Sequence, residues 1–168
     1  MKFKIVDELN VPAHHFWNHL FTTEMEAVIR EGGNLDEYYA EVTEEPTILH
    51  RRVRTLPRLN LPAALKKVVG GDSLGYIEEQ KVPKDGKMEY EWESIPDQAN
   101  LAKKSYTGGT FKVEPLGDDR CRRTIEGEVN VKIFGVGTLA EKYIVSEMEK
   151  TYHNVAKAQE KYVKEKEC

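Results

Sequence analysis

Cysteine is scarce in this sequence: Cys121 and Cys168 are its two cysteines, and no CxxC pair or Cys/His cluster accompanies them. This usage argues against a disulfide framework and against a zinc site. The first eight residues carry charge throughout and lack the apolar run of a secretory signal, and no other stretch has the length of a membrane span. With 168 residues, of which 39% are hydrophobic, we expect one cytoplasmic domain covering residues 1–168.

Signatures of catalysis and of cofactor binding are also missing. His15 and His19 have a spacing that can bind a metal ion, but the glutamate of a metalloprotease HExxH motif is absent between them. The glycines in 70–71 and 135–137 form no phosphate-binding fingerprint. We therefore predict no catalytic residue, no metal site and no cofactor.

Positive charge is concentrated in one segment of a chain whose formal net charge is −4. Between Pro46 and Gly71 there are six basic residues and no acidic one. Cations mixed with apolar side chains suit an anionic membrane surface. We therefore predict transient membrane docking through Arg54, Arg58, Leu61, Leu65, Lys66 and Lys67. Nucleic acid is not expected as a partner, because the overall balance is acidic and no binding motif is present.

Two other interpretations of the basic segment remain open. Its arginines alternate along a predicted strand, and they would pair with the glutamate row Glu89, Glu91 and Glu93 if both lay on a solvated sheet face. Alternatively, the segment 51–67 would bind an acidic protein.

The last thirty residues predict one long amphipathic helix. From Gly137 to Glu167 there is no proline and no further glycine, and the apolar residues fall on one helical stripe. These are Ile144, Val145, Met148, Tyr152, Val155, Ala156, Tyr162 and Val163. At about 1.5 Å per residue the helix is about 40 Å long, enough to lie across a whole small sheet. Gln159 and Glu141 lie on the same side and need a partner there, unless they extend beyond the sheet into solvent.

The preceding residues predict strands and short helices. Residues 3–11 alternate between apolar and polar types, with Asp7 interrupting the apolar face. Pro12 then opens one short helix, and a second follows for which Thr23 and Glu26 predict a capping box. The remaining pattern predicts about six antiparallel strands in 35–45, 47–56, 73–82, 88–93, 101–114 and 120–133, with a short helix or ordered loop at 60–69.

The strictest alternation places Met88, Tyr90 and Trp92 on one strand face and glutamates on the other. Apolar faces of this kind, opposed by the terminal helix, suit a ligand pocket with few polar groups. The predicted ligand-binding residues are Met88, Tyr90, Trp92, Phe111, Val113, Ile125, Val129, Met148, Tyr152 and Gln159. The same residues also fit a dry core beneath the helix, so that alternative stays open.

This order of elements resembles the START-like, or birch-pollen-allergen-like, helix-grip superfamily. The stretches that carry the resemblance are GDSL at 71–74, GGTFKVEP at 108–115 and EGEVNVKI at 126–133, and they are most similar to its domain-of-unknown-function family 2505. A weaker likeness, through 1–3 and 134–136, runs to the PRELI-like phospholipid transfer proteins. The resemblance implies an α+β helix-grip fold: a curved antiparallel sheet of about seven strands, two short helices after the first strand, and a long C-terminal helix over a ligand cavity.

From the residues and the resemblance together we expect a carrier rather than an enzyme. It would bind, and transfer, a lipid or other small hydrophobic molecule between the sheet and the terminal helix. The second hypothesis is an enzyme of this fold, such as a cyclase, aromatase or hydrolase, acting on an apolar substrate. It requires a buried titratable group with a perturbed pKa that opens into the cavity, with Glu141, Asp7 and the histidines as candidates. The third is a protein-interaction module that uses the segment 51–67 over a collapsed cavity.

Overall fold

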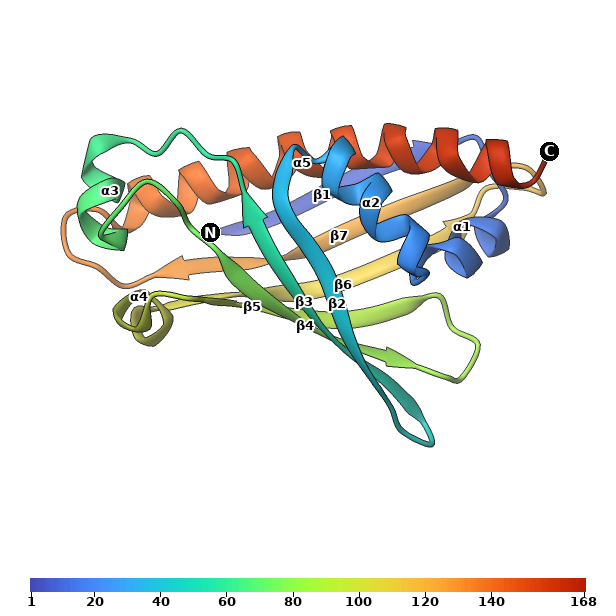
Figure 1. The fold of residues 1–168 in the computed structure, drawn as a ribbon, viewed down its shortest axis with the longest axis horizontal. Helices are drawn as coiled ribbons and strands as arrows, with labels where there is room; N and C mark the ends of the chain where they lie inside the picture. Colours follow the sequence, from blue (N-terminus) through green and yellow to red (C-terminus); the bar gives the residue numbers. More distant parts are fainter.

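The computed structural model describes residues 1–168 and contains seven strands in one antiparallel sheet. The strands are β1 (Lys2–Leu9), β2 (Leu35–Glu44), β3 (Ile48–Pro57), β4 (Tyr76–Pro83), β5 (Glu89–Pro96), β6 (Ser105–Pro115) and β7 (Cys121–Val131). Their order across the sheet is β1-β7-β6-β5-β4-β3-β2, so that β1 joins the far end of the meander. The sheet curves around the long helix α5 (Gly137–Lys166), as Figure 1 shows. The predicted helix-grip fold is confirmed.

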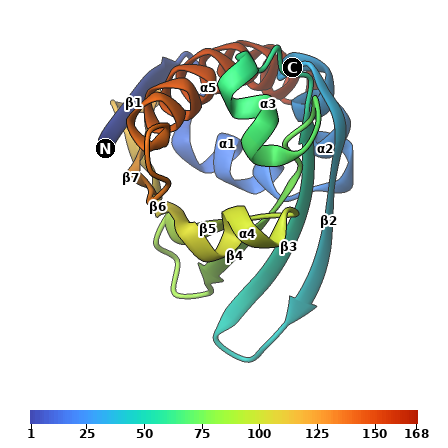
Figure 2. The ribbon, with the colours of Figure 1, turned by 90° about the vertical axis from the view of Figure 1, so that its left-hand side faces the viewer.

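Four shorter helices lie at the two ends of this layered arrangement. They are α1 (Ala13–Leu20), α2 (Thr23–Gly32), α3 (Ala63–Val69) and α4 (Ala99–Lys104). The first two pack against α5, whereas α3 and α4 lie at the opposite end, which faces the viewer in Figure 2. None of the helices combines the length and the apolar character that crossing a membrane requires.

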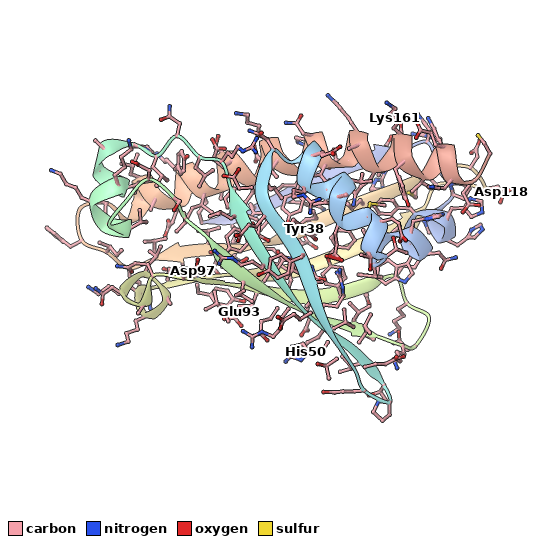
Figure 3. The ribbon with its side chains drawn as sticks, in the orientation of Figure 1. Tyr38, His50, Glu93, Asp97, Asp118 and Lys161 are labelled. Carbon is pink, nitrogen blue, oxygen red and sulfur yellow. The ribbon has the colours of Figure 1, made fainter.

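The core forms between the concave face of the sheet and α5 because both elements are amphipathic. On β5, Tyr90 and Trp92 are buried while Glu93 is exposed, as the alternation of side chains along a strand demands. Figure 3 places Glu93 on the outer side of the sheet and Lys161 on the solvent side of α5. The apolar stripe of α5 therefore faces the sheet, as the sequence predicts, with Val163 fully buried.

The first four residues of the strand predicted at 101–114 form a helix instead. In α4 the side-chain oxygen of Gln98 accepts a 2.6 Å hydrogen bond from the backbone nitrogen of Leu101, which caps the helix. The hydroxyl of Ser105 then donates a 2.6 Å bond to the backbone oxygen of Leu101 where β6 begins. The sequence pattern places the apolar Leu101 in a strand, but Leu101 belongs to α4 and is buried from a helical turn.

The capping box predicted at the start of α2 was also wrong by one residue. The cap is Thr22, whose hydroxyl oxygen accepts a 3.3 Å hydrogen bond from the backbone nitrogen of Met25. Glu26 does not reach back to the cap. Its carboxylate accepts a 3.0 Å bond from the backbone nitrogen of Ala40, and thereby fastens α2 to β2.

A pair of glycines faces each other across β6 and β7. Gly109 lies opposite Gly127 in the register of these strands. A methyl group on Gly109 would overlap the carbonyl oxygen of Glu126, and one on Gly127 would overlap that of Gly108. Backbone atoms therefore occupy the space that a Cβ atom would need, which is a common reason for glycine inside a strand.

Candidate functional site

A cavity of about 170 Å³ lies between the concave face of the sheet and α5. Side chains of β2 to β7 form one wall and side chains of α5 form the other, with residues of α1, α2 and α4 at the ends. Its volume is more than ten times the roughly 15 Å³ that one water molecule needs. The interaction-module hypothesis expected a collapsed cavity, and this finding weighs against it.

The structure places six of the ten predicted ligand-binding residues at the cavity wall. They are Tyr90, Trp92, Phe111, Met148, Tyr152 and Gln159. The other four, Met88, Val113, Ile125 and Val129, pack in or against the hydrophobic core. The position of α5 explains why some of these residues line the cavity and others lie in the core, because α5 packs against β1 and β7. The cavity opens above the strands that the helix does not cover directly.

Glu78 of β4 lines the cavity and was not among the predicted site residues. Side chains alternate along the strand, so Tyr76, Glu78 and Gln80 share its inner face. The Oε2 atom of Glu78 accepts a 2.6 Å hydrogen bond from Nε2 of Gln80, and no protein donor bonds to Oε1. One oxygen of this carboxyl group is therefore held by the protein, while the other is free to meet a ligand.

Gln80 connects Glu78 to a buried positive charge. Nη1 of Arg51 donates a 2.5 Å hydrogen bond to Oε1 of Gln80. Arg51 and Gln80 are 3% and 2% exposed, and the guanidinium lies 4.9 Å from the centre of the Phe21 ring. A buried cation is costly unless hydrogen bonds and nearby charge compensate it. The two hydrogen bonds that link Arg51 to Gln80 and Gln80 to Glu78 supply such compensation. They also fix the orientation of the Glu78 carboxyl group.

Burial raises the pKa of Glu78 above its ordinary value, although the hydrogen bond from Gln80 and the charge of Arg51 offset part of this rise. Four tyrosines of the cavity wall lie near this carboxyl group. Burial raises the pKa of each tyrosine, and the negative charge of Glu78 raises it further. These tyrosines are Tyr38, Tyr76, Tyr90 and Tyr152. Their hydroxyls stay protonated at neutral pH. Glu78 exchanges its own proton closer to neutral pH than an exposed glutamate does.

The sequence pattern of β4 does not reveal directly that Glu78 faces the cavity. Ile77 is the most apolar neighbour, which suggests that Ile77 faces the core. In the structure Ile77 pairs with Ile95, which is 40% exposed on the outer face of the sheet. Val82 indicates the inner face of β4 correctly, since this apolar residue is 5% exposed. Counting back from Val82 in steps of two places Glu78 on the inner face.

A second buried polar cluster, centred on Arg123 of β7, borders the cavity beneath α5. The guanidinium is 1% exposed. It donates hydrogen bonds to Oδ2 of Asp7 at 2.7 Å, to Oε1 of Gln159 at 3.0 Å and to the backbone oxygen of Tyr152 at 2.7 Å. Nδ1 of His153 lies 2.6 Å from the other oxygen of Asp7. Gln159 therefore has the partner it needs, and the cluster ties β1, β7 and α5 together.

The titratable groups that the sequence analysis named for an enzyme do not line the cavity. Asp7 belongs to the buried cluster just described. Glu141 accepts a 2.9 Å hydrogen bond from the backbone nitrogen of Val131. Nε2 of His19 lies 2.7 Å from a carboxylate oxygen of Glu167, at the far end of α5. The requirement for a buried titratable group with a perturbed pKa is met by Glu78 instead.

The arginines of the basic segment lie in ion pairs or inside the protein. Nη1 of Arg54 lies 2.6 Å from Asp97 and its Nε lies 3.0 Å from Glu37, while Nε of Arg58 lies 2.5 Å from Asp36. Arg54 and Arg58 are therefore already engaged with carboxylates of the protein.

The other four predicted docking residues divide into two buried and two exposed side chains. Leu61 and Leu65 are each 4% exposed and belong to the core. Lys66 is exposed and lies 3.2 Å from Asp72, and Lys67 is exposed. An amphipathic α3 thus turns its leucines inward and leaves its lysines in solvent.

The alternative pairing of the arginines with the row Glu89, Glu91 and Glu93 was wrong. β4 lies between β3 and β5, so the two rows are not neighbours. Arg52 pairs instead with Glu79 of β4, at 3.4 Å.

Several hydrogen-bond donors beside the cavity have no partner in the protein. They are Nε1 of Trp92, Nε of Arg123 and the hydroxyl of Tyr143, and all three residues line the cavity. Leaving a buried donor unpaired costs about 1–3 kcal/mol, which an acceptor atom of a ligand would offset. The wall thus combines a broad apolar surface with a few unpaired donors and the carboxyl group of Glu78.

Comparison with known proteins agrees with this architecture. The model of the family described as a protein of unknown function (DUF2505) matches residues 8–163. The aromatase/cyclase Zhui from Streptomyces sp. R1128 aligns with a TM-score of 0.67 at 10% identity, over 98% of this chain and 93% of that chain. A START superfamily protein from Mycobacterium smegmatis aligns with a TM-score of 0.61 at 15% identity, over 98% and 97%.

A further solved structure is norcoclaurine synthase from Thalictrum flavum in complex with dopamine and hydroxybenzaldehyde. It aligns with a TM-score of 0.62 at 18% identity, over 98% of this chain and 87% of that chain. At identities this low the likeness shows a common fold alone. No curated protein matches the sequence.

Proposed function

Since the chain belongs to the family described as a protein of unknown function (DUF2505), we propose a function from its own cavity: binding of a small aromatic or apolar molecule that carries an oxygen acceptor. The observation that carries the proposal is the space between the sheet and α5, whose wall is mainly hydrophobic. Binding sites of this kind bury most of a ligand and orient it with a few polar groups. Trp92 and Tyr143 supply unpaired donors, and the stacked rings of Tyr90 and Phe111, 4.7 Å apart, supply flat apolar surface.

The volume of the cavity favours a small ligand. At about 170 Å³ it lies below the roughly 300–1,000 Å³ of pockets for drug-sized molecules. Norcoclaurine synthase, which shares the fold, was solved with dopamine and hydroxybenzaldehyde, both small aromatic molecules. A molecule of one to three rings suits a cavity of this volume. Binding or transfer of a lipid requires the first helices and the segment 60–69 to move apart.

Native mass spectrometry of gently purified protein tests the proposal directly. A discrete added mass of a few hundred daltons that organic solvent releases is the expected result, and its identification gives the chemical class of the ligand. Protein that carries no added mass, and that takes up no apolar probe in solution, would speak against a binding function.

Filling the cavity from α5 is expected to weaken ligand binding. Met148→Trp places a larger side chain in the cavity, and Trp92→Ala removes part of its wall. Each is expected to weaken binding of the fluorescent probe 1-anilinonaphthalene-8-sulfonate at least about tenfold, which corresponds to about 1.4 kcal/mol. The matched control is Leu139→Trp, because Leu139 lies on the same helix, is 44% exposed and does not line the cavity. If both variants bound the probe as wild type does, the binding site would lie elsewhere.

We further propose that the end of the molecule near α3 docks transiently on an anionic membrane. Phe134, in the turn between β7 and α5, is fully exposed. Exposed lysines surround this end: Lys67 on α3, Lys103 and Lys104 on α4, and Lys132 after β7. The backbone nitrogen of Lys132 bonds to the backbone oxygen of Lys104 at 2.7 Å, so these two segments adjoin (Figure 2). An exposed aromatic ring among cations is suited to an anionic lipid surface.

Phe134→Ser is expected to weaken docking about tenfold, because burial of a phenylalanine side chain contributes about 1.5–3 kcal/mol. The measurement is co-sedimentation with vesicles of phosphatidylcholine with and without phosphatidylserine. Val42→Ser is the matched control, since Val42 is 52% exposed on β2, whose hairpin with β3 projects away from this end. Binding that did not depend on phosphatidylserine, or that both variants weakened equally, would contradict the docking proposal.

A further inference from the structure

The reactive side chains of the cavity are few. Its wall contains no cysteine, histidine or lysine. The serine and threonine hydroxyls of the wall therefore have no histidine or lysine of the wall beside them that could activate a nucleophile; they belong to Thr55, Ser94, Ser105, Thr107 and Thr151. The carboxyl groups of the wall belong to Glu78 and Glu147, and burial raises the pKa of Glu78. The chemistry available to the wall is therefore proton transfer by a carboxyl group.

The indole N–H of Trp92 is an unpaired hydrogen-bond donor near Glu78, at a distance that a small ligand can span. In the register of β4 and β5, Glu78 lies opposite Ser94 and Gln80 lies opposite Trp92. Trp92 is thus the diagonal neighbour of Glu78 on the same sheet face, a relation that places the two residues about 7–8 Å apart. Nε1 of Trp92 is buried without a partner. A carboxyl group with one free oxygen and an unpaired donor therefore border the same space.

We propose that Glu78 is the catalytic base of an enzyme that transfers a proton at the carbon next to the carbonyl group of a small aromatic ketone, with the indole N–H of Trp92 bonded to the carbonyl oxygen. This inference rests on the proposed binding function and adds a reaction to it. The acceptor oxygen proposed above for the ligand becomes the carbonyl oxygen, and the aromatic rings of the wall hold the ring of the ketone.

The step balances without any further reactant. The free oxygen of the Glu78 carboxylate takes a proton from the carbon beside the carbonyl group, so that a C–H bond breaks and an O–H bond forms. The electron pair of the C–H bond forms a C=C bond, and a pair of the C=O bond moves to oxygen as an enolate. The proton on Glu78, or a hydron from water that has replaced it, then adds to the same carbon of the enolate, or to the far carbon of a C=C bond that is conjugated with the enolate. The products are the exchanged or the isomerised ketone and the original carboxylate.

The surroundings of Glu78 suit both halves of this step. The hydrogen bond from Gln80 holds one oxygen of the carboxyl group, so the other keeps a fixed direction. Donors placed where negative charge develops stabilise an enolate far better in a cavity without water than in solution. Trp92 supplies one such donor, and Tyr76 and Tyr90 line the same cavity. A carboxyl group whose burial favours the protonated form is also a stronger base than an exposed one.

The test is hydrogen–deuterium exchange at the carbons next to the carbonyl group of 2-tetralone, a two-ring ketone. Loss of these proton signals in D₂O is followed by NMR, and binding of the same probe is measured separately by saturation-transfer difference. Wild-type protein is expected to accelerate the exchange well above buffer. Glu78→Gln is expected to lose at least about 100-fold of that acceleration, which is the usual contribution of a general base.

Three comparisons make this result specific. Glu93→Gln is the matched control, since Glu93 is an exposed glutamate on the outer face of β5, and it is expected to exchange the probe at the wild-type rate. Trp92→Phe keeps an aromatic ring and removes the donor, so it is expected to bind the ketone more weakly and, at saturating ketone, to slow the exchange about tenfold or more. Glu78→Asp keeps a carboxyl group at a changed position and is expected to fall between wild type and Glu78→Gln.

The outcomes separate the reaction from the binding function. If wild type bound 2-tetralone and exchanged its protons no faster than buffer, or if Glu78→Gln exchanged them at the wild-type rate, the catalytic proposal would be overturned and the binding function would stand. If wild type bound neither 2-tetralone nor 1-anilinonaphthalene-8-sulfonate, both proposals would fall. Binding of the latter probe alone would overturn the assignment of an aromatic ketone as substrate.

Discussion

Replacing Arg123 by alanine is expected to lower the free energy of unfolding by about 3–5 kcal/mol, the usual effect of removing one partner of a buried ion pair. The guanidinium is 1% exposed and bonds to Asp7, to Gln159 and to the backbone of Tyr152. Without it, Asp7 becomes a largely buried carboxylate whose remaining partner is His153. The loss therefore includes the cost of an uncompensated charge as well as three hydrogen bonds.

Urea denaturation measures this effect, and a neighbouring arginine serves as its control. Arg122 precedes Arg123 on β7, faces outward and pairs with Glu8 at 3.3 Å. Because this pair is solvent-exposed, Arg122→Ala is expected to cost no more than about 1 kcal/mol. Equal losses for the two variants would mean that the buried cluster contributes no more to stability than a surface pair.

Replacing Gly127 by alanine is expected to destabilise the fold by about 3 kcal/mol or more. The added methyl group would overlap the carbonyl oxygen of Gly108, and this oxygen belongs to the backbone of the neighbouring strand. No side-chain rotation relieves such an overlap, so β6 and β7 must separate. Changes that force backbone to move lie at the upper end of overpacking effects.

The control for this variant is another glycine with free space around it. At Gly71 a methyl group would meet no atom within 4 Å, so Gly71→Ala is expected to change the free energy of unfolding by no more than about 0.5 kcal/mol. Both variants are compared by thermal and urea denaturation. A Gly127→Ala protein as stable as Gly71→Ala would show that β6 and β7 separate at little cost.

The fold could be predicted because its local patterns agree with its packing. The alternation in β5 and the stripe of α5 each have one apolar face, and these two faces meet. The small error at Leu101 arose because a single buried leucine does not distinguish a strand from a short helix. The choice between them depended on Gln98, whose cap is a local hydrogen bond rather than a periodic pattern.

The polar groups of the site were harder to predict, because their partners are distant in sequence. Asp7 interrupts the apolar face of β1, which is a signal that something pairs with it, but Arg123 lies 116 positions away. Three arginines follow one another at positions 120, 122 and 123, and one sequence does not indicate which of them turns inward. Glu78 is hard to predict for a related reason, because its partners Gln80 and Arg51 become visible only when β3 and β4 are paired.

The site divides its tasks between two layers, and this division has an evolutionary consequence. The hydrogen bonds that orient the Glu78 carboxyl group come from β3 and β4, through Arg51 and Gln80. The helix α5 contributes the opposite wall of the cavity, through residues such as Ile144 and Met148. Amino-acid substitutions on α5 change the shape of the cavity and leave the Glu78 carboxyl group in place. Under the proposed function, proteins descended from one such gene diversify in the molecules they accept through changes at a few helical positions, while the strands keep Glu78 in the same place.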